Sequence, residues 1–401
     1  MLRAEQLHEQ ILERMDLTRE ASDDELLDFI YQVLEERSRE EFIPLHEKAA
    51  LGRELFNAFR KLDILQDLLE DDSITEIMIN GTENIFIERN GKISMSDKKF
   101  ISKGKLEDVV QQMVATCNRV VNESAPIVDA RLPDGSRVNV VLPPVALNGP
   151  IVTIRKFPKH RITMDQLLDY EAIDGDTAEF LIKLVRAGYN IFISGGTGSG
   201  KTTFLNALSD YIPADERIIV IEDNAELQIT ELPNLVRLEV RNANVEGMGE
   251  ISIRDLIRTA LRMRPDRIIV GEVRGPETID MLQALNTGHD GSLSTGHANS
   301  PRDMLARLET MVLMGMEIPL QAVRRQIAYG IDIMVHLGRL RDKSRKVLEV
   351  MEVLGYESEE IRLQPLYHFE EQSSESGKIR GTWIQKSELT HKEKLMGAGY
   401  Q

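Results

Sequence analysis

The sequence has 401 residues, of which 42% are hydrophobic and 29% charged, the normal balance of a soluble globular protein. Its net charge of −17 argues against a general nucleic-acid binder, although a local basic channel would be compatible with that charge. A chain of this length is too long to fold around one ordinary hydrophobic core, so we expect two or three domains.

The chain has a single cysteine, Cys117, which excludes an internal disulfide and makes the reducing cytoplasm the natural compartment. Cys117 falls within an apolar helical pattern that runs from Leu106 to Val121, so we expect it to pack in a core. No apolar run approaches the roughly 18 residues of a membrane span, and no signal peptide is visible. Any membrane contact is therefore expected to come through a partner or a surface.

Residues 1–62 are predicted to form an acidic bundle of amphipathic helices. Ser22 to Glu25 match the capping-box pattern at a helix start, and apolar residues follow at helical spacing from Leu26 to Leu34. The sequence of this range contains no motif that indicates a catalytic or binding site.

Residues 63–155 are predicted to form a separate, smaller α+β domain. The runs 74–79, 85–88, 138–142 and 151–156 are strand-like, and Pro133-Asp134-Gly135 has the chemistry of a turn between two strands. Three arginines of this range, Arg131, Arg137 and Arg155, are candidates to meet phosphate charge, with surface ion pairs as the alternative.

Residues 156–345 alternate short apolar strands with helices, which predicts an α/β fold with a mainly parallel, helix-covered sheet. Ligands of such sheets bind at the carboxyl ends of the strands. Residues 346–401 are predicted to hold further short strands, then a polar stretch from Glu370 and a weak tail.

The run Gly195 to Thr202 fits G-x-x-x-x-G-K-[ST], the phosphate-binding loop of nucleotide triphosphatases, between an apolar strand and a helix. Its glycines let backbone N–H groups point at phosphate oxygens, while Lys201 reaches the β- and γ-phosphates and Thr202 can ligate Mg²⁺. We therefore expect ATP and Mg²⁺ as cofactors, held by Gly196, Thr197, Gly198, Ser199, Gly200, Lys201, Thr202 and Thr203.

Acidic residues end two of the core strands, Glu222-Asp223 and Glu272. A triphosphatase needs one carboxylate for the Mg²⁺ shell, for which Glu272 is a candidate with Thr202, and one that orients or deprotonates water. The sequence leaves open which of Glu222 and Glu272 activates water.

Two Gly-His pairs follow in the chain, and His297, rather than His289, is favoured as the residue that senses the γ-phosphate. No zinc site is expected, because the chain lacks a cysteine cluster. Five arginines surround the second acidic strand and are candidates for either the nucleotide pocket or a subunit contact: Arg258, Arg262, Arg264, Arg267 and Arg274.

Four motifs occur together: the glycine loop, Ile221 to Leu227, Ile269 to Glu277 and Ser294 to Ser300. In this combination the chain resembles the type II/IV secretion-system ATPases. Asp129 to Arg137 resembles the CpaF/TadA branch, which powers tight-adherence (Flp-type) pili.

The resemblance implies a hexameric ring with a RecA-like core, Mg²⁺-dependent ATP hydrolysis at subunit interfaces, and work at the cytoplasmic face of a membrane-embedded pilus or secretion platform. By position, Gly195 to Thr203 would be the Walker A loop, Glu222 would lie in the Asp box and Glu272 at the Walker B position. His297 would lie in the His box, and Arg131, Arg137 and Arg155 would face the phosphates.

Two other functions stay open on the sequence. A scaffold that binds ATP with little turnover would need a missing carboxylate or a disabled loop, and neither is seen. A RecA-like nucleic-acid translocase would be stimulated by DNA or RNA, which the charge of −17 disfavours, so no nucleic-acid partner is expected.

Overall fold

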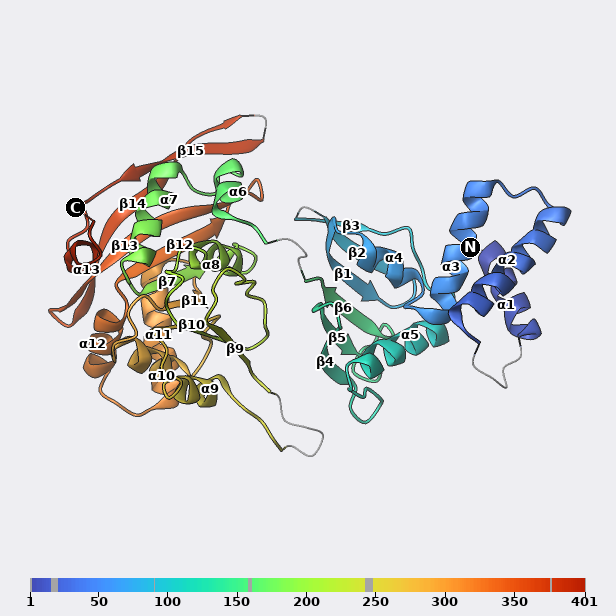
Figure 1. Ribbon diagram of the computed structural model, residues 1–401, viewed down its shortest axis with the longest axis horizontal. Helices are drawn as coiled ribbons and strands as arrows, with labels where there is room; N and C mark the ends of the chain where they lie inside the picture. The colour runs from blue at the N-terminus through green and yellow to red at the C-terminus, as the bar shows by residue number, and fades with distance from the viewer. Residues whose placement is uncertain are drawn as a thin grey trace. The chain divides into compact units, whose positions relative to one another are not determined.

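The computed structural model describes residues 2–15, 21–89, 91–157, 161–241, 248–375 and 377–400. The chain forms two compact units, Met1–Lys159 and His160–Gln401 (Figure 1). No helix among these described residues is long and apolar enough to cross a membrane.

The first unit begins with a helical cluster, as expected for residues 1–62. It comprises α1 (Leu2–Arg14), α2 (Asp23–Glu40) and α3 (Leu45–Arg60). Ser22 caps α2 through the predicted capping box with Glu25. Buried apolar residues of all three helices, such as Ile11, Ile30 and Leu55, form one core.

The rest of the first unit is a six-stranded antiparallel sheet with two helices, α4 (Ile64–Glu70) and α5 (Lys103–Thr116). Leu65 and Leu68 of α4 and the apolar residues of α5 share one core with every second residue of the central strands. The spatial order is β3 (Lys92–Met95), β2 (Asn84–Arg89), β1 (Ile74–Asn80), β6 (Ile151–Arg155), β5 (Arg137–Val141), β4 (Ile127–Arg131).

The second unit is built on a nine-stranded mixed sheet (Figure 1). Six neighbouring strands are parallel, and the last three in the chain add antiparallel at one edge. The order is β15 (Lys378–Gln385), β14 (Glu360–Glu375), β13 (Arg345–Glu357), β12 (Ile333–Arg339), β7 (Ile191–Gly195), β11 (Leu293–His297), β10 (Arg267–Val270), β8 (Ile218–Glu222), β9 (Leu235–Glu239).

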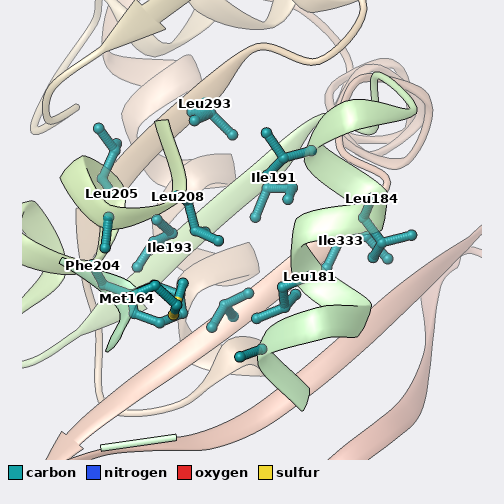
Figure 2. Close-up of a cluster of buried hydrophobic side chains, with 14 of the residues drawn as sticks. Met164, Leu181, Leu184, Ile191, Ile193, Phe204, Leu205, Leu208, Leu293 and Ile333 are labelled. Carbon is teal, nitrogen blue, oxygen red and sulfur yellow. The ribbon is translucent and has the colours of Figure 1, made fainter. Parts of the chain in front are cut away.

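Helices cover both faces of this sheet, so its central strands are buried on both sides. Ile191 and Ile193 of β7 point into one core, shown in Figure 2, and Phe192 points into the other. The first core takes α6 (Met164–Asp169), α7 (Gly175–Arg186) and α8 (Lys201–Ser209); the second takes α9 (Ile253–Ala260), α10 (Thr278–Leu285), α11 (Pro301–Gly315) and α12 (Leu320–Gly330). The chain continues into a short helix, α13 (Glu393–Gly397). This is the predicted α/β fold with a RecA-like core.

Two expectations of local structure are wrong. The helix expected to reach Val121 stops at Thr116, and Asn118 just beyond it has a left-handed backbone with φ of 52°, which a continuing helix does not allow. The residues after Phe369, expected to be a polar stretch and a weak tail, form strands, since β14 continues to Glu375 and β15 follows it. The domain boundaries after residues 62, 155 and 345 stay predictions; β13 begins at Arg345 within the same sheet as the core.

Leu181 on α7 is fully buried in the first core, so Leu181→Ala is expected to lower the free energy of unfolding of the second unit by about 2–5 kcal/mol. The matched control is Leu313→Ala, because Leu313 on α11 is 43% exposed and its loss should cost under about 1 kcal/mol. Trp383, the only tryptophan, lies in β15 and reports denaturant unfolding of this unit by fluorescence. Equal losses for the two variants would contradict this description of the core.

Candidate active site

The glycine loop connects the buried strand β7 to helix α8, as the sequence predicts. Gly198 and Gly200 have φ of 69° and 97°, a left-handed backbone that glycine adopts without a steric penalty. At Gly195 an added Cβ would lie 2.5 Å from the carbonyl oxygen of Leu337 and 2.5 Å from Oγ of Ser199. Gly195 is therefore required by the close approach of β12 and by the curl of the loop.

Lys201 is the first residue of α8, and only 7% of it is exposed. Its Nζ donates to the carbonyl oxygens of Gly195 at 3.2 Å and Gly196 at 3.3 Å, and it lies 3.1 Å from Nδ1 of His297. The ammonium is thus held directly above the loop, where the predicted phosphates would lie.

Glu272 and His297 lie beside Lys201 because their strands end at the same edge of the sheet. His297 is the last residue of β11 and pairs in register with Gly195 of β7, and Glu272 follows β10, the next strand. Oε1 of Glu272 lies 2.9 Å from Nε2 of His297. Oε2 of Glu272 accepts a hydrogen bond from Arg274 at 2.8 Å.

Burial lowers the pKa of His297 below 6.5, and the positive charge of Lys201 lowers it further, whereas Glu272 acts in the opposite direction. The imidazole is therefore neutral at neutral pH. A neutral ring agrees with the contact at Nδ1, because this nitrogen can accept a hydrogen bond from the ammonium of Lys201 only when it carries no proton.

Glu222 ends β8 and is 4% exposed. Its Oε1 accepts hydrogen bonds from the backbone N–H groups of Glu226 and Leu227, each at 2.8 Å, and Oε2 lies 3.6 Å from Arg237. Burial raises the pKa of Glu222. This carboxylate is engaged in shaping the following loop, whose Glu226 is 3.5 Å from the hydroxyl of Thr202.

Two buried oxygens at the loop fit a bound nucleotide and its metal. Within the described part of the chain, Oγ of Ser199 is buried and has no hydrogen-bond partner, and Oε1 of Glu272 is buried beside Nε2 of His297. The Ser199 hydroxyl can donate to a phosphate oxygen, and the Glu272 carboxylate can accept from water or ligate a metal ion. The described residues contain no cluster of three or more Asp, Glu, His and Cys side chains fit to hold a metal.

The three arginines of the first unit lie in one row across its sheet. Arg131 on β4 is in register with Arg137 on β5, which is in register with Arg155 on β6. Nε of Arg131 donates to the carbonyl oxygen of Gly135 at 3.3 Å. The next residue of the row is Glu76 on β1, whose pKa is raised by burial and by Glu88, against the effect of Arg155. Contact of these arginines with phosphates stays a prediction.

The arginines around β10 separate into different environments. Arg254 and Arg258 bind Asp280 of α10, and Arg267 is buried with Glu216, so these have structural partners in the second unit. Arg274 is the member that reaches the site, through Glu272. His289 lies before β11, at the strand end away from His297, and contacts the carbonyl oxygen of Ala284.

Sequence reasoning missed three residues near the loop: Glu226, Arg237 and Arg345. Arg237 lies on β9, the strand that pairs with β8, and Glu226 belongs to the motif 221–227. Their positions in the sequence therefore could have indicated that both lie near Glu222. Nε of Arg345 donates to the carbonyl oxygen of Gly198 at 2.8 Å across 147 residues of chain, and no local pattern predicts that contact.

Strand, glycine loop and helix, with carboxylates and a histidine at neighbouring strand ends, define a P-loop nucleotide-binding protein. The family model described as "Type II/IV secretion system protein" matches residues 59–375. The chain belongs to this family.

Individual proteins that are similar in sequence are consistent with this family. The chain is 36% identical over 293 residues to a putative conjugal transfer protein of Mycobacterium tuberculosis strain H37Rv, covering 72% of this chain and 83% of that protein. It is 34% identical over 330 residues to the type IV secretion system protein VirB11 of Brucella abortus strain 2308, covering 75% and 90%. The structure of the ATPase DotB of Yersinia pseudotuberculosis has a TM-score of 0.54 over 73% of this chain and 78% of that one, at 17% identity, and shows similarity of fold.

Removing the charge of Lys201 should raise the pKa of His297, because that charge is one of the causes that lower it. In Lys201→Ala, an NMR titration of the His297 ring is therefore expected to move toward 6.5, while Lys201→Arg, which keeps the charge, should leave the pKa low. An unchanged His297 titration in Lys201→Ala would show that the two side chains are not in contact.

Proposed function

We propose that this protein is a Mg²⁺-dependent ATPase motor that powers the assembly of a Flp/Tad-type pilus, or of a related type II/IV secretion machine. The proposal extends to retraction of the same pilus. Membership of the type II/IV secretion family supports the class of machine. The segment Asp129 to Arg137 supports the tight-adherence branch.

One observation carries the ATPase proposal: the continuous contact from Lys201 to His297 to Glu272 at the mouth of the glycine loop. A binding scaffold needs the loop and the lysine alone. Placing a neutral histidine and a carboxylate next to that lysine suits the handling of the γ-phosphate and of a water molecule.

We assign a separate role to each residue of the site. Lys201 and the N–H groups of residues 196–203 bind the phosphates, and Thr202 and Glu272 would hold Mg²⁺, which when bound would neutralise phosphate charge. Glu272 contacts the side chains of His297 and Arg274 and can orient water or accept its proton once bound nucleotide rearranges these contacts, whereas Oε1 of Glu222 accepts from two backbone N–H groups. We therefore assign water activation to Glu272 and loop positioning to Glu222. His297, which lies between Lys201 and Glu272, is the proposed sensor of the γ-phosphate.

The arginine row on β4, β5 and β6 supports a shared site. Three arginines directly across neighbouring strands bring positive charge together on one face of the sheet, which favours the binding of an anion there. We propose that Arg131, Arg137 and Arg155 face the phosphates in a homo-hexamer, and that the ring works in the cytoplasm, peripheral to the cell membrane, on a membrane-embedded platform protein.

Phosphate release from ATP tests the assignment. Lys201→Ala is expected to abolish both binding and turnover, and Glu272→Gln should lower kcat by about 10²–10⁴ while ATP still binds. Glu222→Gln keeps one acceptor oxygen for the loop and should lose less than Glu272→Gln.

If wild-type protein bound ATP without measurable turnover, alone and with its platform partner, a nucleotide-dependent scaffold would replace the ATPase proposal. If Glu222→Gln lost more activity than Glu272→Gln with the fold intact, the two carboxylates would exchange roles.

A further inference from the structure

The side chain of Arg345, which is 147 residues from Gly198 in the sequence, contacts the glycine loop. Arg345 is the first residue of β13, and its Nε donates to the carbonyl oxygen of Gly198 at 2.8 Å. An added Cβ on Gly200 would lie 3.5 Å from Cδ of Arg345, so the stem of the arginine also lies against the loop. The contact joins the two left-handed glycines of the loop, which have the freest backbone in it.

We propose that Arg345 is a positioning residue for nucleotide binding, which acts by fixing one peptide plane of the glycine loop. The carbonyl of Gly198 and the N–H of Ser199 belong to the same trans peptide and point in opposite directions. Holding the carbonyl toward Arg345 therefore turns the Ser199 N–H across the loop, where it lies 3.3 Å from the carbonyl oxygen of Gly196. That bond is long, so a phosphate oxygen can replace the carbonyl as acceptor.

The arginine is itself held in place by the turn that precedes it. Arg345 is in register with Arg339 of β12, and β12 runs beside β7, with Leu337 opposite Gly195. In the turn, Asp342 accepts from the N–H of Ser344 at 3.0 Å and from the N–H of Ile379 on β15 at 2.8 Å. The β12–β13 hairpin is thus fixed to both the phosphate-loop strand and the outer strands of the sheet.

Pre-ordering the loop changes affinity more than turnover. Without Arg345 the peptide between Gly198 and Ser199 is free to rotate in the nucleotide-free protein, and ordering it on binding reduces affinity. Once nucleotide is bound, its own contacts hold the loop, so the chemical step keeps most of its rate. This inference rests on the proposed ATP binding and assigns to Arg345 a share of its affinity.

The test compares wild type, Arg345→Ala, Arg345→Lys and the control Arg341→Ala. Arg341 belongs to the same hairpin but pairs with Glu371 on β14. For Arg345→Ala we expect the Kd for a fluorescent ATP analogue and the KM for ATP to rise about tenfold, the effect of one lost hydrogen bond to a charged group, with kcat within about twofold. Arg345→Lys should fall between wild type and Arg345→Ala, and Arg341→Ala should match wild type.

A second measurement needs no nucleotide. Hydrogen exchange of a peptide covering residues 196–204 is expected to be faster in Arg345→Ala than in wild type, and unchanged in Arg341→Ala. The inference is overturned if Arg345→Ala leaves both exchange and Kd unchanged, or if Arg341→Ala shifts them equally. If wild type fails to bind the analogue and Lys201→Ala makes no difference, the proposed function fails instead, and the exchange result still decides the role of Arg345.

Discussion

A buried lysine ammonium determines how the site of the second unit is arranged. A charge with so little exposure is stable only when each donor has a partner, and Lys201 finds two loop carbonyls and one ring nitrogen of His297. The ring must then stay neutral, and its other nitrogen meets Glu272, whose second oxygen is bound by Arg274. Positive, neutral, negative and positive groups therefore follow one another along the strand ends, and each fixes the protonation or direction of the next.

This arrangement depends on the order of strands in the sheet. Because β11 lies between β7 and β10, His297 is placed between the loop lysine and Glu272 without any long connection. The neighbouring strand β8 places Glu222 at the same edge, where it binds the backbone of its own loop. Two carboxylates at or just after the ends of core strands thus have different surroundings, because Glu222 is bound by backbone N–H groups and Glu272 by the side chains of His297 and Arg274.

Much of this could be predicted from the sequence, for physical reasons. Continuous apolar runs identify strands buried on both faces, and a glycine loop followed by Lys-Thr has few other structural explanations. The extension of β14 past Phe369 could not be predicted, because edge strands pair through backbone groups and tolerate polar side chains. Nor could the contact of Arg345 with Gly198, since the two residues meet only when β12 lies beside β7. The choice between Glu222 and Glu272 likewise needed the hydrogen bonds of each carboxylate.

The claim that the arginines of the first unit complete the site on another subunit is tested most directly by steady-state ATP hydrolysis as a function of protein concentration, with molecular mass measured at each point. The account predicts a specific activity that rises as hexamers form, and a smaller rise when Arg137 is replaced by Ala. A specific activity that is already full in the monomer and stays flat would contradict it, because each subunit would then contain a complete site.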